Sequence, residues 1–296
     1  MMLYKTTIIP KSNFATPLKG DTLFGHICWA IRYTLGEFRL NELLKSYQEK
    51  PFLIVSDGFV SGYLPKPTMP SIFLGENLEF KKENRKKIWL SLDDLQKGNF
   101  VNSKTNHETG CDAKKVVTIK NSINYLTFRT DNSGKFTPYA LMESKIGKQD
   151  VYFLLNNKLL SLEELNNAVD FIAKSGYGKR ASIGKGFFEY SFFEEVNIKR
   201  SSNAFMTLSP AVINRNEIKD CFYEPFTRFG KHGGLLASKN PFKNPLLMAD
   251  RGSVVVYEDI CEKDYIGRAI FNHSKNSNTV HQGYAILIAT EIKNAK

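Results

Sequence analysis

The stretch from Ser175 to Glu189 (SGYGKRASIGKGFFE) has the composition of a loop that binds phosphate groups. Glycine allows the backbone to adopt positive φ angles and to approach a partner closely. Successive amide groups in such a loop can form a concave site for an anion, and cationic side chains beside it add attraction. Four glycines fall within eleven residues here, interleaved with three cations: Gly176, Gly178, Gly184 and Gly186, with Lys179, Arg180 and Lys185.

The spacing of these residues differs from that of two common nucleotide-binding loops. A Walker A loop follows a strand, precedes a helix and has four residues between its glycine and its Gly-Lys pair. Here five residues separate Gly178 from Gly184, Gly186 stands where Ser or Thr is required, and the flanking elements are reversed. The dinucleotide motif G-x-G-x-x-G is absent. We therefore expect a nucleic-acid backbone as the ligand and no cofactor; a helix-to-strand connection with merely solvated lysines remains the alternative.

The composition favours a polyanionic partner. The 296 residues contain 41 Lys and Arg against 30 Asp and Glu, which gives a formal charge of +11. Such an excess favours nucleic acid before membrane. The four cysteines are scattered without a C-x-x-C pair, as in proteins of reducing compartments. No signal-peptide core or membrane-length apolar run occurs. We expect a cytoplasmic protein without membrane contact.

Strand and helix signals flank the glycine-rich stretch. Val151–Leu155 is apolar and β-branched, which predicts a short strand. Ser161 and Glu164 have the spacing of a capping box, so a helix is expected to begin there and to end before the loop. Phe187–Val196 is predicted to be the strand that follows. The loop is therefore expected to connect a helix to a strand.

The N-terminal segment predicts a similar arrangement. Leu3–Ile9 reads as a strand, and a helix capped by Asp21 or Thr22 follows through Arg32. Phe52–Val60 reads as the next strand. Together with the later elements this is the βαββαβ order of a ferredoxin-like domain, if one strand of the intervening segment is counted.

We therefore predict an α+β fold with two domains. The first, over residues 1–196, is ferredoxin-like (RRM-like) and carries an insertion at about 65–147. Within the insertion, Val116–Ile119 and Tyr125–Arg129 are predicted to be the two arms of a hairpin. The second domain, over 197–296, is expected to be rich in strands, namely Ala204–Leu208, Cys221–Phe229, Val254–Tyr257, Tyr265–Phe271 and Tyr284–Thr290.

Metal and nucleophile sites are not expected. His107 and Cys111 are four residues apart and His273 and His281 eight apart, and neither pair has zinc-module spacing. His26 is a candidate general acid or base for an RNA phosphodiester. A histidine in such a place is more often structural, and we favour that interpretation.

Two segments together resemble a known family. The first is FATPLKGDTLFGHICW at residues 14–29, followed by SDGFVSGYLPKP at 56–67; the second is GYGKRASIGKG at 176–186. They are similar to the CRISPR-associated RAMP superfamily. The most similar member is the fourth subunit of the type III-A Csm effector complex, an antiviral ribonucleoprotein. The resemblance implies a RAMP domain with the glycine-rich loop near its end and a second, RAMP-like domain.

The resemblance also implies a function and a set of site residues. The expected protein is a non-catalytic RNA-binding subunit that holds the 5′ handle of the crRNA near the guide–target duplex. It would dock the large polymerase/nuclease subunit and the backbone RAMP subunit. The insertion hairpin near 116–129 would be a thumb against the duplex. In this assignment the loop is shaped by Gly176, Gly178, Gly184 and Gly186, phosphates are neutralised by Lys179, Arg180 and Lys185, Ser182 donates a hydrogen bond, Tyr177 stacks on a base, and Lys19, Thr22 and His26 line the same groove.

Two other functions stay open. One is a metal-independent RAMP endoribonuclease that processes precursor crRNA, with His26 acting together with Tyr177 or Lys179. The other is a protein-interaction scaffold without direct RNA contact.

Overall fold

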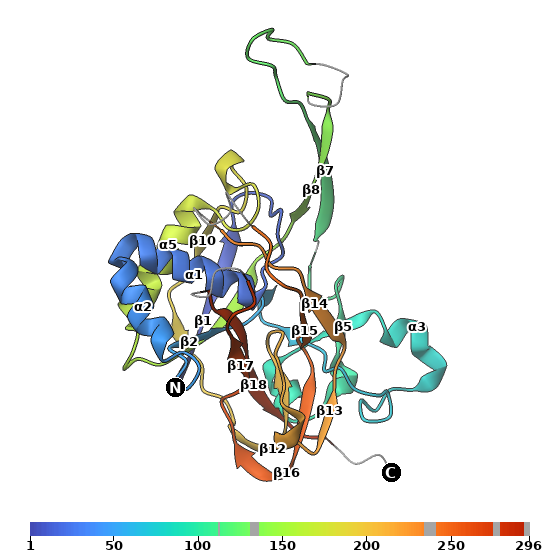
Figure 1. Ribbon diagram of the computed structural model, residues 1–296. Coiled ribbons are helices and arrows are strands. Elements are labelled where there is room, and N and C mark those ends of the chain that lie inside the picture. Colours follow the sequence, from blue (N-terminus) through green and yellow to red (C-terminus); the bar gives the residue numbers. More distant parts are fainter. Residues whose placement is uncertain (112, 131–135, 234–240, 275–278, 293–296) are drawn as a thin grey trace.

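The first sheet is built from the N-terminal two thirds of the chain (Figure 1). The computed structural model describes residues 1–111, 113–130, 136–233, 241–274 and 279–292. The sheet has the strand order β10–β1–β9–β2, with β11 also paired to β1 and β3 to β9, and every pairing is antiparallel. Its strands are β1 (Met2–Pro10), β2 (Leu53–Val55), β3 (Phe59–Val60), β9 (Gln149–Leu155), β10 (Phe188–Tyr190) and β11 (Glu194–Glu195).

Helices α1 (Gly20–Leu35) and α5 (Leu162–Ser175) pack side by side, and α2 (Glu37–Lys45) continues from α1 (Figure 1). The predicted capping box of α5 is confirmed, because Ser161 and Glu164 exchange side-chain-to-backbone hydrogen bonds. The start of α1 lies directly against β2. A Cβ on Gly20 would stand 2.2 Å from the Val55 carbonyl oxygen, so only glycine permits this approach.

The second sheet comes from the C-terminal third and has the antiparallel order β13–β16–β12–β18–β17. A separate two-stranded ladder joins β14 to β15. The strand-rich character expected for residues 197–296 is confirmed, and the division of the chain into domains at 196 stays a prediction. The strands are β12 (Ser201–Thr207), β13 (Asp220–Phe222), β14 (Pro225–Arg228), β15 (Leu246–Ala249), β16 (Val254–Glu262), β17 (Tyr265–Ile270) and β18 (His281–Thr290).

One continuous core joins the two sheets. Buried side chains of the first sheet and its helices pack against Met206, Ile286 and Ile288 of the second. The buried side-chain amide of Gln282 accepts a hydrogen bond from the Val55 amide at 2.9 Å and donates one to the Val55 carbonyl at 2.8 Å. Gln282 thus occupies the hydrogen-bonding groups at the free edge of β2, as a neighbouring strand would.

The insertion at 65–147 forms a small sheet and a long hairpin. The small sheet joins β4 (Leu64–Pro65), β5 (Lys87–Leu90) and β6 (Lys104–Thr105), beside the short helices α3 (Lys81–Asn84) and α4 (Leu92–Gln96). The hairpin pairs β7 (Lys114–Lys120) with β8 (Tyr139–Lys145) and projects from the body of the molecule (Figure 1).

One of the two predicted arms of this hairpin is confirmed and the other is wrong. The segment Val116–Ile119 lies in β7 as expected, but its partner is β8 and not Tyr125–Arg129. The apolar side chains Tyr125, Leu126 and Phe128 are exposed near the tip, so their apolar character does not reflect pairing or burial. In the described part of the chain, no helix has both the length and the apolar character needed to cross a membrane.

Candidate nucleic-acid interface

The glycine-rich loop connects α5 to β10, as expected. Gly176, Gly178, Gly184 and Gly186 all have positive φ angles, between 74° and 91°. Three of them, Gly176, Gly178 and Gly186, also have no room for a side chain. A Cβ on Gly186 would lie 2.1 Å from the Tyr177 carbonyl oxygen, and one on Gly178 would lie 2.6 Å from the Thr16 Cβ. The loop therefore requires glycine both for backbone conformation and for close packing on the segment that follows β1.

The first amides of the loop are satisfied by protein acceptors. The Gly178 amide donates to His26 Nε2 at 3.1 Å, and the Lys179 amide donates to Thr16 Oγ1 at 2.9 Å. Burial lowers the pKa of His26 to about 4, so its imidazole is neutral near pH 7 and can accept this hydrogen bond. His26 therefore touches the loop, as expected of a groove residue, but through a contact that holds the loop in place.

The next three amides are open. The backbone N–H groups of Arg180, Ala181 and Ser182 donate to no acceptor in the described part of the chain. They lie where the 3-10 turn Ala181–Ile183 begins, and Arg180 precedes it in a left-handed conformation (φ 67°). Lys179, Arg180 and Ser182 all have exposed side chains. We call these three side chains and the three open amides the loop rim; it is the part of the predicted phosphate cradle that a ligand can reach.

Tyr177 corrects one prediction. Its side chain is fully buried, with the ring 6.0 Å from that of Phe14 and 4.9 Å from that of His26. Its hydroxyl donates to the Pro17 carbonyl at 2.9 Å and accepts from the Lys19 amide at 3.3 Å. A ring enclosed in this way has no face free for a base, so the predicted stacking role is wrong and the tyrosine anchors the loop to the core.

Lys185 corrects a second prediction. Its ammonium group lies 2.7 Å from Glu143 Oε2, and the Glu143 side chain has no exposed surface. Asn13 Nδ2 donates to the same carboxylate oxygen at 2.9 Å. Because a buried carboxylate requires a cation, Lys185 is committed to Glu143 and is not a free phosphate ligand. It fastens the loop to β8 at the base of the hairpin.

The loop rim is continuous with the hairpin. The Arg180 guanidinium lies 5.6 Å from the centroid of the Tyr139 ring, and Tyr139 is paired with Lys120 across the hairpin. Phe14 and Ser144 exchange backbone hydrogen bonds of 2.9 and 2.8 Å at its base. Neither Tyr139 nor Glu143 was among the predicted site residues, because their contacts depend on how the hairpin pairs. Lys114, Lys120 and Lys145 lie on the same face of the hairpin as Tyr139 and Glu143, and Lys115 lies on the opposite face.

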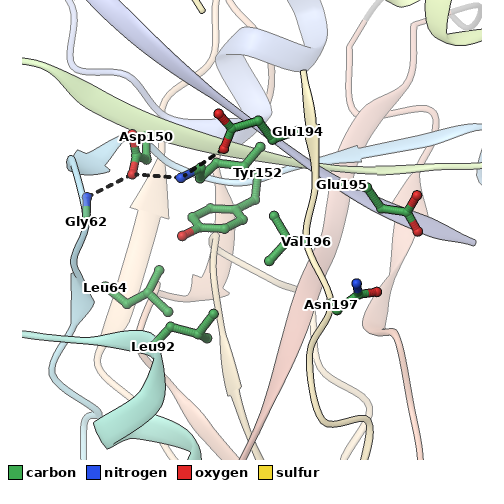
Figure 2. Close-up of a pocket in the computed structure, with 10 residues that line it drawn as sticks. Gly62, Leu64, Leu92, Asp150, Tyr152, Glu194, Glu195, Val196 and Asn197 are labelled. Carbon is green, nitrogen blue, oxygen red and sulfur yellow. Dashed lines mark hydrogen bonds and ion pairs between the residues drawn. The ribbon is translucent and has the colours of Figure 1, made fainter. Parts of the chain in front are cut away.

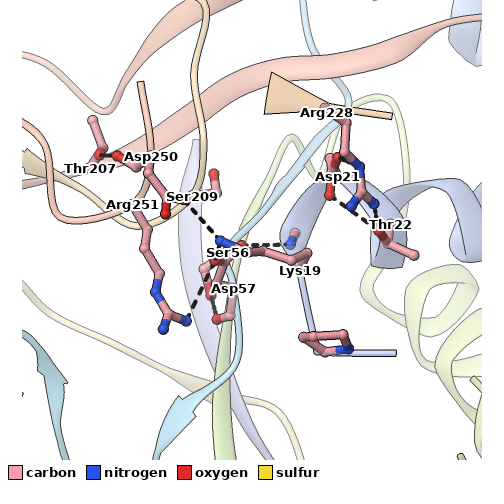
Figure 3. Close-up of polar contacts among 12 residues, drawn as sticks. Lys19, Asp21, Thr22, Ser56, Asp57, Thr207, Ser209, Arg228, Asp250 and Arg251 are labelled. Atoms are coloured by element: carbon pink, nitrogen blue, oxygen red, sulfur yellow. Dashed lines mark hydrogen bonds and ion pairs between the residues drawn. The ribbon is translucent and has the colours of Figure 1, made fainter. Parts of the chain in front are cut away.

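The Lys19 side chain is largely enclosed and points toward Asp57 and Asp250 (Figure 3). Its ammonium group is 2.9 Å from a carboxylate oxygen of Asp57 and 2.9 Å from one of Asp250. Asp57 is fully buried and accepts from the Gly20 amide at 2.8 Å, and Arg251 lies 3.6 Å from it. The expectation that Lys19 lines an RNA groove is therefore wrong, since its ammonium group is paired with the buried carboxylate of Asp57 and the partly exposed carboxylate of Asp250.

Thr22 belongs to a second polar cluster, which joins α1 to the C-terminal part of the chain (Figure 3). Its hydroxyl contacts the Arg228 guanidinium, and Arg228 Nε lies 2.6 Å from Asp21 Oδ2. His281 Nε2 is 3.4 Å from the same oxygen. Burial raises the pKa of Asp21, while the adjacent Arg228 opposes this shift. Neither Asp21 nor Thr22 caps α1, whose N-cap position is Lys19 without a side-chain cap; both tie α1 to the C-terminal sheet region.

Two residue pairs were considered as metal ligands from the sequence, His273 with His281 and His107 with Cys111. The rings of His273 and His281 are 5.5 Å apart, and burial lowers their pKa values to about 4 and about 3. Over the described ranges, His, Cys, Asp and Glu form no group of three or more that could hold a metal ion. His107 and Cys111 lie in the insertion after β6.

Comparison with known proteins identifies the fold. No protein-family model matches the chain, and no curated protein does. A chain in a crystal structure of a Csm1–Csm4 cassette in complex with cA4 is similar, with a TM-score of 0.62 and 17% identity over 99% of both chains. A chain in the same kind of cassette in complex with AMPPNP aligns with a TM-score of 0.62 and 18% identity, over 99% of this chain and 100% of that one.

A third structure narrows the identity of the matching component. A chain in a crystal structure of a Csm3–Csm4 subcomplex in the type III-A CRISPR-Cas interference complex has a TM-score of 0.60 and 16% identity, over 98% of this chain and 100% of that one. Csm4 is the component that the two kinds of assembly share. The chain thus has a mixed α/β fold close to that of Csm4, a RAMP protein, in agreement with the resemblance carried by its sequence motifs.

Proposed function

We propose that the chain is a non-catalytic RNA-binding subunit of a type III-A CRISPR (Csm) complex and that it holds the 5′ handle of the crRNA. The observation that carries this proposal is the loop rim on a Csm4-like fold. Exposed Lys179 and Arg180 and the three open amides, of Arg180, Ala181 and Ser182, lie within four consecutive residues of the loop. Such a surface suits phosphate oxygens, which accept hydrogen bonds from backbone amides and attract cations.

We infer a ferredoxin-like domain for the N-terminal part. Numbered by their place in a βαββαβ motif, the strands β1, β2, β9 and β10 are the first to fourth. Their observed order, β10–β1–β9–β2, is then 4–1–3–2 with antiparallel pairing, and α1 and α5 are the two crossover helices. This layout supports the RAMP domain that the sequence predicts, with the glycine-rich loop between the second helix and the fourth strand.

We further propose that the β7–β8 hairpin is the thumb that lies against the guide–target duplex. Its projecting position in Figure 1 and its composition support this role. Val117 and Met142 are paired across the hairpin, and both are exposed, as is Ile119. Exposed apolar side chains flanked by lysines suit a surface that contacts both bases and phosphates. The neighbouring Arg180–Tyr139 contact joins this thumb to the loop rim.

The proposal includes protein partners and a place in the cell. The similar chains belong to complexes of Csm4 with Csm1 and with Csm3. By analogy, this subunit would dock a large polymerase-like subunit and a backbone RAMP subunit, and would act in the cytoplasm. The scaffold alternative differs only in lacking direct RNA contact.

The absence of catalysis is part of the proposal. The alternative nuclease would use His26 with Tyr177 or Lys179. His26 Nε2 accepts the Gly178 amide, and the Tyr177 hydroxyl is engaged with Pro17 and Lys19. Burial also lowers the pKa of His26 to about 4, which leaves it a weak base for proton abstraction at neutral pH. These contacts support a positioning role for His26.

Salt-dependent RNA binding tests the proposal. We would measure the affinity of the purified chain for an RNA with a repeat-derived 5′ handle, over a series of salt concentrations and with EDTA present. For single strands each phosphate contact contributes about 0.7 to the slope of log K against log[salt]. The double variant Lys179→Ala/Arg180→Ala is therefore expected to bind more weakly, with a slope smaller by about 1.4.

The matched control is Lys45→Ala/Lys50→Ala, which removes two exposed lysines at and after the end of α2. This control should retain the wild-type slope. Equal slopes for the two double variants would refute the assignment of the loop rim. A discrete RNA cleavage product that disappears in His26→Ala would replace the proposal by the nuclease.

A further inference from the structure

A pocket of about 330 Å³ opens where strands β1, β9 and β11 meet (Figure 2). Lys5 comes from β1, Tyr152 from β9, and Glu194 and Glu195 from β11. We call this site the acidic pocket. It shares no residue with the loop rim, so it has no place in the RNA-binding site proposed above.

The polar groups at the base of the acidic pocket are already paired. Asp150 accepts hydrogen bonds from Thr7 Oγ1 at 2.7 Å, from Ser61 Oγ at 2.9 Å and from the Gly62 amide at 2.8 Å. Lys5 Nζ lies 3.9 Å from Asp150. With this set of donors around it, Asp150 is a fixed, buried anion at the back of the pocket.

The mouth of the acidic pocket carries an excess of negative charge. Lys5 Nζ also lies 3.6 Å from Glu194 Oε2, so one ammonium group is paired with both Asp150 and Glu194. Glu195 has no ion-pair partner in the described part of the chain, and its side chain, the next one along β11, points away from Lys5 (Figure 2). The site is acidic in a protein whose formal charge is +11. A phosphate would be repelled here, whereas a cationic group would be attracted.

The remaining surface of the acidic pocket is apolar. Leu64, Leu92 and Val196 contribute aliphatic side chains (Figure 2). The ring of Tyr152 lies among them, and its hydroxyl makes no hydrogen bond to a described residue. This combination fits the alkyl stem of arginine or lysine, which packs on apolar surface while the charged end reaches carboxylate and hydroxyl oxygens.

The rim of the acidic pocket is the free edge of the first sheet. Strands β10 and β11 pair with β1, and no further strand pairs with them within the described residues. Phe192, between them and two residues before Glu194, has 92% of its surface exposed. A free small cation would leave this ring in water, whereas a protein surface would cover it. A second copy of the chain is disfavoured by the mutual repulsion of two strongly basic molecules.

We propose that the acidic pocket receives an arginine or lysine side chain from a different protein, whose apolar surface covers Phe192. Glu194 binds the cationic end, Tyr152 accepts one of its hydrogen bonds, and Leu64 and Leu92 pack on its stem. The site is thus a protein-docking surface that is separate from the RNA-binding surface.

Charge reversal tests the proposal. The probes are two purified proteins of the proposed complex, its large polymerase-like subunit and its backbone RAMP subunit. The choice of these two proteins rests on the proposed function. Glu194→Arg/Glu195→Arg should weaken the affinity for one probe by about 100-fold, since a desolvated charge pair becomes a repulsion. Phe192→Ala should weaken the same affinity by about tenfold. Each variant is also titrated with the handle RNA.

The matched control is Glu49→Arg/Asp259→Arg, which reverses two exposed carboxylates that have no ion pair within the described residues. It should change the affinity for either probe less than threefold. Loss of probe binding with unchanged RNA binding supports the proposal and separates it from the RNA site; failure of handle binding in the wild-type chain would count against the proposed function alone.

Three results would overturn the proposal. The first is equal affinity of both double variants for both probes, which includes the case in which neither probe binds the wild-type chain. The second is a homodimer, seen by light scattering, that the Glu194→Arg/Glu195→Arg change dissociates, because the occupant would then be a second copy. The third is spermidine binding that the same change abolishes while probe binding is unaffected.

Discussion

The ammonium group of Lys185 lies 2.7 Å from the carboxylate of Glu143, and this pair joins the glycine-rich loop to the base of the hairpin. The Glu143 side chain is fully enclosed, and Lys185 retains 17% of its side-chain surface. Lys185 therefore stabilises the position of the loop, although it looks like a phosphate ligand in the sequence. The two neighbouring cations, Lys179 and Arg180, are left as the ones that a polyanion can reach.

Removing this cation should destabilise the fold. Lys185→Met would leave the Glu143 carboxylate buried without a counter-charge, at a cost of about 3 kcal/mol in the free energy of unfolding. Urea denaturation would measure the loss. The comparison is Lys179→Met, an exposed position where a change within about 0.5 kcal/mol is expected. Similar stabilities for the two variants would contradict a stabilising role of the Lys185–Glu143 ion pair.

Two glycines of the loop should respond differently to alanine. Gly184 (φ 84°) has open space around a Cβ position, so Gly184→Ala incurs only the left-handed backbone penalty of about 1 kcal/mol. Gly186 (φ 74°) would place its Cβ 2.1 Å from a carbonyl oxygen of Tyr177, so Gly186→Ala must displace the backbone. We expect it to cost more than about 3 kcal/mol. Thermal unfolding of both variants measures the difference, and equal losses would contradict the close packing at Gly186.

Substitutions of Tyr177 distinguish a role in anchoring the loop from a role in stacking on a base. Tyr177→Phe removes the hydroxyl bonded to Pro17 and Lys19 and should lower the stability by about 1 kcal/mol. The ring is buried, so the affinity for handle RNA and its salt slope should be unchanged at temperatures where the variant is folded. Weaker RNA binding by Tyr177→Ala at unaltered stability would instead restore the base-stacking role.

Acid should destabilise the protein through its buried histidines. Burial lowers the pKa of His26 and His273 to about 4 and that of His281 to about 3. The unfolded chain, with values near 6.5, binds more protons than the folded chain in the window between these limits. The stability contributed by the neutral imidazoles is therefore complete above about pH 6.5 and is lost as the pH falls toward 4.

The variant His26→Gln tests how much His26 contributes to this loss of stability at low pH. Its side-chain carbonyl can still accept the Gly178 amide, but no proton is taken up on unfolding. Between about pH 6 and 4.5 the free energy of unfolding should fall less steeply than in the wild type, by up to about 1.4 kcal/mol per pH unit. Chemical denaturation at a series of pH values gives both slopes. Identical slopes would mean that His26 is not buried in the neutral form.

The elements could largely be predicted from the sequence because their signals are local. The capping box at Ser161 and Glu164 places the start of α5 within four residues of chain. Apolar runs likewise predicted β1 and most of the second sheet, but Cys221–Phe229, expected as one strand, is divided between β13 and β14. The four glycines of the loop, which need positive φ, were also visible as a pattern.

The assignment of side chains to the site was harder because it depends on distant partners. Lys185 looked like a phosphate ligand because its acid, Glu143, is 42 residues away on β8, a strand that was not predicted from the sequence. Lys19 binds Asp250, 231 residues later in the chain. A basic side chain in a motif shows its charge in the sequence, but its counter-charge becomes visible only when the chain is folded.

Strand β18 has a consequence for the order in which the molecule assembles during synthesis. It is synthesised long after β2, since Gln282 follows Val55 by 227 residues, and all ten of its residues are buried. Gln282 occupies the free edge of β2, and the Tyr284 hydroxyl donates to the Gln48 carbonyl at 2.7 Å. A growing chain therefore carries its first sheet with an uncovered edge until β18 has been synthesised. A nascent chain stalled just before residue 281 should be cut by a protease near Phe52–Val55, where the completed chain resists.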